Sequence, residues 1–207
     1  MSNIFDKKKL NILIIGTGMY ACGRGTDGYG TILPAIYEWK KSGFEGDVYI
    51  AGTRQDGVRG VREKTEALDK LYGFNVNINY YPKNETNDPD AYKKAISDIP
   101  KPACALVVVP DDLHRTVAGY AVENGLHTLV VKPLAPTIEE TLELIELQKK
   151  HNVYCAVEFH KRFDRSNLKL KDTISGGRIG EPLYFVVEYS QRKSIPTEKF
   201  KKWVETT

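Results

Sequence analysis

The sequence predicts an α/β protein built on a doubly wound parallel sheet, and the order of its apolar runs is the main reason. Short β-rich runs alternate with segments whose apolar residues return every three or four positions, a pattern typical of strands joined by helices. Such alternation places the strands parallel, with helices on both faces of the sheet. The 207 residues, 41% of them hydrophobic, suffice for the core of one such domain and the start of another.

Each predicted element has its own local signal. Strands are predicted at residues 11–15, 48–51, 76–80, 103–109, 127–131 and 153–157. The helix between the second and third strands is predicted to have Val58, Val61, Leu68 and Leu71 on one face, and Gly73 is placed to end it. The run from Thr137 to Glu140 has the form of a capping box and predicts the start of another helix. Its expected apolar face is Leu142, Ile145 and Leu147.

The pattern changes after residue 158, where a second domain is expected to begin. Residues 161–171 are polar and basic, and residues 183–189 alternate as a strand with one more polar face. We therefore expect a nucleotide-binding domain at 1–158, followed at 159–207 by a linking helix and the first strand of an α+β domain. That second domain would be too short to be complete, so we expect a truncated chain, the alternative being a natural short protein.

Composition excludes several classes of function. The formal net charge of +3 comes from 30 basic and 27 acidic residues spread along the chain, so no nucleic-acid partner is expected. Cys22, Cys104 and Cys155 lie far apart with no C-x-x-C pair, so neither a disulfide framework nor a metal site is predicted. The N-terminal apolar run is too short for a signal or membrane segment. We expect a cytoplasmic protein without a membrane role.

A glycine-rich turn follows the first strand. Gly16 would make the tight turn out of the strand, Thr17 follows it, and Gly18 would let the backbone approach a pyrophosphate. The next helix would aim its N-terminus at the phosphates. This context, strand then turn then helix, predicts a Rossmann-type dinucleotide site.

The third glycine of the usual spacing is replaced by Ala21, and an extended loop at residues 19–30 intervenes. Arg24 and Gly28 in this loop are candidates for contact with a phosphate. The alternative is that the loop is only a flexible turn.

The end of the second strand bears on the choice of cofactor. An acid there suits the ribose hydroxyls of NAD, and a basic residue suits the 2′-phosphate of NADP. The chain has Thr53 and Arg54 at this place, while the nearest acid, Asp56, comes two residues late. This favours NADP over NAD, the alternative being that Arg54 is an ordinary solvated arginine.

Three motifs near the fourth and fifth strands resemble the glucose–fructose oxidoreductase and inositol dehydrogenase (Gfo/Idh/MocA-like) family of NAD(P)-dependent enzymes. They are Val-Pro-Asp-Asp-Leu-His at 109–114, Gly-Leu-His at 125–127 and Val-Val-Lys-Pro-Leu-Ala at 130–135. The likeness runs from about residue 11 to about residue 189. It implies a homo-oligomeric enzyme that moves a hydride between the nicotinamide and a sugar, a polyol or a sugar derivative.

By this resemblance Lys132 is the expected catalytic residue and also a candidate for contact with the cofactor. It follows the fifth strand, at the sheet edge that binds ligands, where an ammonium could stabilise charge on the substrate oxygen and relay its proton. The resemblance also places Pro110, Asp111 and His114 beside the nicotinamide. The alternatives are a surface lysine and, for Asp111, a helix cap.

After the sixth strand, His160 and Arg162 match the family's path into its substrate domain. His160 is a candidate catalytic residue, and both are candidates for binding a sugar hydroxyl, a carboxylate or a phosphate. A solvated basic helix start is the competing interpretation.

Two departures from the family leave a second class of function open. Val131 stands where the family usually has a glutamate, and the family's Asp-x-x-x-His pair is not found after Lys132. If these are real losses, the chain is a catalytically silent NAD(P)-binding module or a redox sensor. A methyltransferase using the glycine loop ranks last, because it explains neither Lys132 nor the turn at Pro110.

Overall fold

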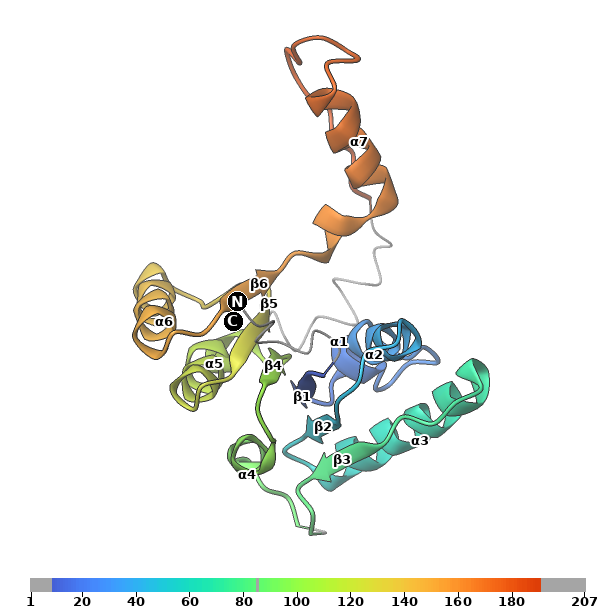
Figure 1. Cartoon of the computed structure of the whole chain (residues 1–207), viewed down its shortest axis with the longest axis vertical. Helices are drawn as coiled ribbons and strands as arrows, with labels where there is room; N and C mark the ends of the chain where they lie inside the picture. Colours follow the sequence, from blue (N-terminus) through green and yellow to red (C-terminus); the bar gives the residue numbers. More distant parts are fainter. Residues whose placement is uncertain (1–8, 85, 191–207) are drawn as a thin grey trace, which may run out of the picture. The chain divides into compact units, whose positions relative to one another are not determined.

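The computed structural model describes residues 9–84 and 86–190, and its elements alternate along the chain (Figure 1). The strands are β1 (Asn11–Ile15), β2 (Val48–Ala51), β3 (Ile78–Tyr81), β4 (Ala103–Val107), β5 (His127–Val131) and β6 (Cys155–Glu158). The helices are α1 (Met19–Cys22), α2 (Ile32–Lys41), α3 (Gln55–Tyr72), α4 (Ala91–Asp98), α5 (His114–Glu123), α6 (Ile138–His151) and α7 (Arg165–Ser175). Two short 3-10 helices, η1 (Asp111–Leu113) and η2 (His160–Phe163), complete the order.

The six strands form one sheet in the order β3-β2-β1-β4-β5-β6. This is the strand order of the Rossmann fold, and the predicted fold class is confirmed. The pairs β1–β2, β1–β4, β2–β3 and β4–β5 are all parallel, with Ile12 opposite Val48 and Cys104. The chain reverses its direction of travel across the sheet between β1 and β4. That switch point is where folds of this kind bind their ligands.

Helices cover both faces of the sheet, and each face has its own core. In Figure 1, α1, α2 and α3 lie on one face and α4, α5 and α6 on the other. One core joins Ile12, Ile14, Val48 and Ile50 to Leu33, Val61 and Leu68. The other joins Leu13, Ile15, Ala105 and Val107 to Ala118, Leu126 and Leu144. β1 is buried on both faces, and its last four residues, 12–15, are consecutive apolar residues.

The helix signals in the sequence are mostly confirmed, but Leu71, predicted on the apolar face of α3, is 68% exposed. Gly73 ends α3 in a left-handed conformation, with φ of +75°. Thr137 caps α6, and its side chain accepts a hydrogen bond from the Glu140 N–H at 3.2 Å. The predicted apolar face of α6 was wrong in one respect, because Leu142 is exposed and Leu144 is the buried residue. Leu147, which was predicted, packs partly buried against the same core as Leu144.

The residues after β6 differ from the expectation. The chain divides between Val157 and Glu158 into two units, and the second unit contains η2 and α7. The strand predicted at 183–189 is not formed: Leu183 and Val186 are 92% and 86% exposed, and no strand is present in the described part of this unit. A strand needs a hydrogen-bonded neighbour and a covered face, and alternation in the sequence supplies neither.

Candidate dinucleotide-binding site

The first turn of the site, after β1, requires glycine for a reason visible in the backbone. Gly16 has φ of +118°, and a Cβ added there would lie 2.0 Å from the Val108 carbonyl oxygen. The Gly16 N–H donates to the Ala51 carbonyl oxygen at 2.8 Å, and the Val108 N–H donates to that of Ile15 at 2.8 Å. Gly16 therefore holds the ends of β1, β2 and β4 together at the switch point.

Gly18 is a glycine of a different kind. Its φ is −78°, and no atom lies within 4 Å of a Cβ built on it. The fold itself would accept a side chain here, so the open space in front of Gly18 is available to a ligand. Helix α1 begins at the next residue, which shortens the extended loop predicted at 19–30.

Thr17 is only 7% exposed, and its side chain points into the protein. A Cβ on Gly52 would lie 2.7 Å from its Cγ2, and one on Gly57 would lie 2.5 Å from its Oγ1. Thr17 therefore packs the glycine turn against the turn that joins β2 to α3. Only its backbone remains for a phosphate.

The loop after α1 is folded tightly and attached to α3. A Cβ on Gly23 would lie 2.0 Å from the Gly28 carbonyl oxygen, which shows how closely the two ends of the loop approach. Lys64 on α3 donates to the Thr26 carbonyl oxygen at 2.9 Å. These contacts connect the two ends of the loop to each other and the loop to α3.

Two arginines from separate turns meet at one carboxylate. Arg24 Nη2 lies 3.1 Å from Asp56 Oδ2, while Arg54 Nε and Nη2 lie 3.0 and 3.2 Å from Oδ1 and Oδ2. Partial burial would raise the pKa of Asp56, but the Gly57 N–H and the two guanidinium groups outweigh it and lower that pKa. Asp56 is therefore ionised at neutral pH, and Arg54, whose side chain is 63% exposed, is both solvated and paired with it.

Thr53 lies beside this cluster. Its side chain is exposed, and its carbonyl oxygen accepts from the Asp88 N–H at 3.0 Å. The hydroxyl is therefore on the surface at the end of β2, as its predicted role requires.

The turns after β4 and β5 are joined by one buried side chain. His114 is 0% exposed, with Nδ1 2.6 Å from the Pro133 carbonyl oxygen and Nε2 3.0 Å from that of Val109. The sequence placed His114 at the nicotinamide, but in the structure both its ring nitrogens face backbone carbonyls. His114 thus connects the turn that carries Pro110 to the turn that carries Lys132.

The remaining candidates on these turns face solvent. Lys132 and Pro110 are exposed, and Asp111 is half-buried at the start of η1. The alternative role of Asp111 as a helix cap is not seen, because neither η1 nor α5 has a side-chain cap. The Lys132–Pro133 peptide is cis. Lys132 thus stands at the C-terminal end of β5, on the edge of the sheet shared with Gly18.

His160 and Arg162 lie in η2, within the second unit. His160 Nδ1 is 3.2 Å from Glu158 Oε1, and the Arg162 guanidinium lies over the Phe159 ring, 4.8 Å from its centroid. Both side chains are exposed. Their local partners orient them without burying them.

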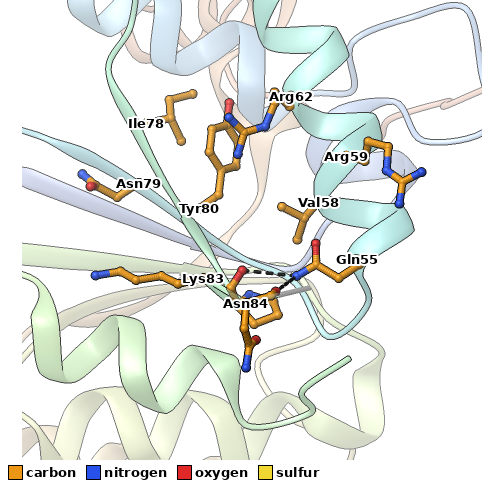
Figure 2. Close-up of a pocket in the computed structure, with 10 residues that line it drawn as sticks. Gln55, Val58, Arg59, Arg62, Ile78, Asn79, Tyr80, Lys83 and Asn84 are labelled. Carbon is orange, nitrogen blue, oxygen red and sulfur yellow. Dashed lines mark hydrogen bonds between the residues drawn. The ribbon is translucent and has the colours of Figure 1, made fainter. Parts of the chain in front are cut away.

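A separate pocket of about 510 Å³ lies between α3 and the edge strand β3 (Figure 2). In Figure 2, Arg62 reaches the Tyr80 ring, and Gln55 donates to the carbonyl oxygens of Pro82 and Asn84. Its lining shares no residue with the glycine turn. The pocket thus excludes the glycine turn, while its lining residue Gln55 stands between Arg54 and Asp56 in the sequence.

The described residues give no support to a reactive thiol, a metal site or a membrane-spanning helix. Burial raises the pKa of Cys22 to about 12 and that of Cys104 and Cys155 to about 11, so none of these thiols is ionised at neutral pH. Residues 9–84 and 86–190 contain no group of three metal-ligating side chains. No helix within that part of the chain is both long and apolar enough to cross a bilayer.

Comparison with known proteins agrees with this geometry. Residues 61–159 match the model of a family described as an oxidoreductase family with an NAD-binding Rossmann fold. The predicted resemblance to this family is confirmed. The matched stretch includes the family motifs with His114 and Lys132, and it begins after the glycine turn and Arg54. The chain therefore carries a Rossmann domain similar to the NAD-binding domain of this family.

The chain matches only part of the length of each individual relative. The chain is 33% identical over 97 residues to scyllo-inositol 2-dehydrogenase (NAD(+)) of Bacillus subtilis, which is 47% of this chain and 28% of that protein. It is 37% identical over 79 residues to inositol 2-dehydrogenase of Corynebacterium glutamicum, 38% of this chain and 23% of the relative. A probable dehydrogenase from Thermotoga maritima has the same fold, with a TM-score of 0.58 and 24% identity over 83% of this chain and 42% of that one. The chain thus spans about a quarter of these curated relatives.

Two functional features were missed or misread from the sequence. Asp56 comes two residues later than the acid expected at the end of β2. Only the structure shows that it pairs with both Arg24 and Arg54. His114 was predicted beside the nicotinamide, and its burial could not be found from the sequence because its partner Pro133 is 19 residues away.

Proposed function

We propose that this chain is the cofactor-binding part of an NAD(P)-dependent oxidoreductase that transfers a hydride to or from a CH–OH group of a sugar or polyol. The observation that carries the proposal is the open backbone at Gly18, beside the switch point held by Gly16. A dinucleotide's pyrophosphate needs such close access to the backbone. The substrate class rests on the names of the relatives, which act on inositol.

Each half of the crevice has residues suited to one half of the dinucleotide. The adenosine half would meet Thr53, Arg54 and Arg24, with the packed loop at Gly28 beside them. The nicotinamide half would meet Pro110 and Asp111, which stand on the turn fixed by His114. NADP is the nucleotide that the two arginines favour.

Lys132 is the proposed catalytic residue. When bound, the nicotinamide would accept or supply the hydride. Lys132 would hold the substrate oxygen through a hydrogen bond, stabilise negative charge on it and carry the proton that leaves or joins it. Its exposed position after β5 and its fixed turn suit this role. His160 and Arg162 would bind substrate hydroxyl or acidic groups.

The proposal also covers the cellular compartment and the oligomeric state of the complete protein. The three cysteines are unpaired, which suits a reducing compartment such as the cytoplasm. A homo-oligomer is proposed for the complete enzyme.

Calorimetric titration with NADPH and NADH tests the cofactor proposal. We expect saturable binding of about one nucleotide per chain, stronger for NADPH, with that preference lost in Arg54→Ala. Lys132→Ala should bind nucleotide nearly as well as the wild type, since its role is toward the substrate. A folded chain, verified by circular dichroism, that binds neither nucleotide would contradict the proposal.

A further inference from the structure

The cluster at the start of α3 has an unusual composition for the ribose side of a Rossmann site. Its two cations come from the loop after α1 and from the end of β2, 32 and 2 residues away from the acid they share. Arg24, Arg54 and Asp56 have side chains that are 43%, 63% and 51% exposed, so solvent and solutes reach all three. The two guanidinium groups are thus gathered around an anion that belongs to the protein.

The fold places the adenosine ribose at the end of β2, next to this cluster. The 2′-phosphate of NADP would need guanidinium edges that are free to donate. The carboxylate of Asp56 already uses the Nε and Nη2 edge of Arg54 and one nitrogen of Arg24. Its negative charge would also repel a phosphate at the same place.

We propose that Asp56 is the specificity-determining residue for the choice between NADP and NAD, because its carboxylate competes with the 2′-phosphate for Arg24 and Arg54. The ribose of NAD carries a neutral hydroxyl at this position, so NAD binding does not require the ion pairs to open. This inference rests on the proposed NAD(P) site and adds the residue that limits its preference for NADP.

Asparagine is the substitution that separates this role from a structural one. Asp56 Oδ1 also accepts a hydrogen bond from the Gly57 N–H at 2.9 Å. An asparagine side-chain oxygen can keep that bond, so Asp56→Asn removes the charge while the start of α3 is preserved. Asp27→Asn is the matched control, because Asp27 is an exposed acid in the same loop as Arg24.

The experiment is calorimetric titration of wild type, Asp56→Asn, Asp27→Asn and the double variant Arg54→Ala/Asp56→Asn with NADPH and NADH at fixed salt. We expect Asp56→Asn to bind NADPH about tenfold more tightly and NADH within about twofold of the wild type. Asp27→Asn should change the NADPH to NADH ratio by less than about twofold, and the double variant should lose most of the gain.

Three results would overturn the inference. If folded Asp56→Asn binds NADPH no more tightly than the wild type while NADH still binds, this inference is overturned but the proposed cofactor site is not. An equal gain in Asp27→Asn also overturns it, since the effect would then be one of net charge. If neither nucleotide binds to the wild type or to Asp56→Asn, the proposed cofactor site fails together with this inference.

Discussion

The two halves of the proposed crevice are held together by interactions of opposite kinds. The turns after β4 and β5 are joined by His114, which is fully buried and faces one carbonyl oxygen on each turn. The turn after β2 and the loop after α1 are joined at Asp56 by ion pairs among exposed side chains. One connection is shielded from water, and the other is open to it.

This difference matches what each half would have to do. Buried hydrogen bonds are costly to break, so the turns that carry Pro110 and Lys132 keep a fixed separation. Exposed ion pairs contribute little to stability and exchange easily with other ions. The nicotinamide side therefore has the rigidity that chemistry needs, while the adenosine side has charges that a ligand can rearrange.

The largest loss of stability is expected for a substitution at Gly16, where the two halves of the proposed crevice meet. Gly16→Ala would place a Cβ 2.0 Å from a backbone oxygen at positive φ, so the ends of β1 and β4 must move apart. The free energy of unfolding should fall by about 4 kcal/mol, measured by urea denaturation. Gly18→Ala is the control and should leave it within about 0.5 kcal/mol. Equal losses in both variants would show that Gly16 does not have this special role.

The buried connection is tested next, by His114→Ala. Loss of the ring leaves a buried cavity and removes the nitrogens that face the two carbonyl oxygens, so the free energy of unfolding should fall by about 3 kcal/mol. His151→Ala, at the partly exposed end of α6, should cost less than about 0.5 kcal/mol. A loss at His114 no greater than that at His151 would contradict the contrast between the halves.

Asp98 is intermediate in burial between His114 and Asp56, because its side chain is 22% exposed. Its carboxylate accepts from Lys94 at 2.6 Å, from the Tyr81 hydroxyl at 2.7 Å and from Lys83 at 3.4 Å. The Lys94 bond, followed by the bond from Tyr81, lowers the pKa of Asp98 to about 2, below the value of about 3.9 for an unfolded chain.

Because the folded pKa is the lower one, the stabilisation is present above about pH 4 and is lost as the pH falls toward 2. Asp98→Asn should lower the free energy of unfolding by about 1 kcal/mol at pH 7. The difference between wild type and variant should shrink between pH 4 and pH 2 in denaturation curves. A difference that is constant with pH would show that the ionised carboxylate is not the cause.

The smallest effect on stability is expected at the exposed cluster. Asp56→Asn should change the free energy of unfolding by less than about 0.5 kcal/mol, and added salt should reduce even that. Thermal unfolding at low and high salt measures it. A loss comparable to that of His114→Ala would mean that the two halves are not held differently.

The sequence predicted most of the fold because its core strands are buried on both faces and appear as uninterrupted apolar runs. It also predicted the cap at Thr137, which depends on residues three positions apart. It misplaced the buried face of α6 at Leu142, since burial there depends on how α5 packs. It predicted a strand at 183–189 from alternation alone, whereas a strand forms only beside a partner.

The candidate site was predicted less completely. Gly16, Gly18 and Lys132 are recognisable because their roles depend on adjacent residues. The convergence of Arg24 and Arg54 on Asp56 joins segments 32 residues apart, and no local pattern reveals it. The burial of His114 likewise depends on the turn at Pro133, which is 19 residues away.

The most direct test of the dinucleotide site is calorimetric titration of the wild type and of Gly18→Ala with NADH. A methyl group at Gly18 would occupy space that the protein leaves open, so we expect saturable binding by the wild type and at least about tenfold weaker binding by an equally stable Gly18→Ala. Equal affinities in the two proteins would contradict the placement of the pyrophosphate against Gly18, and with it the crevice described above.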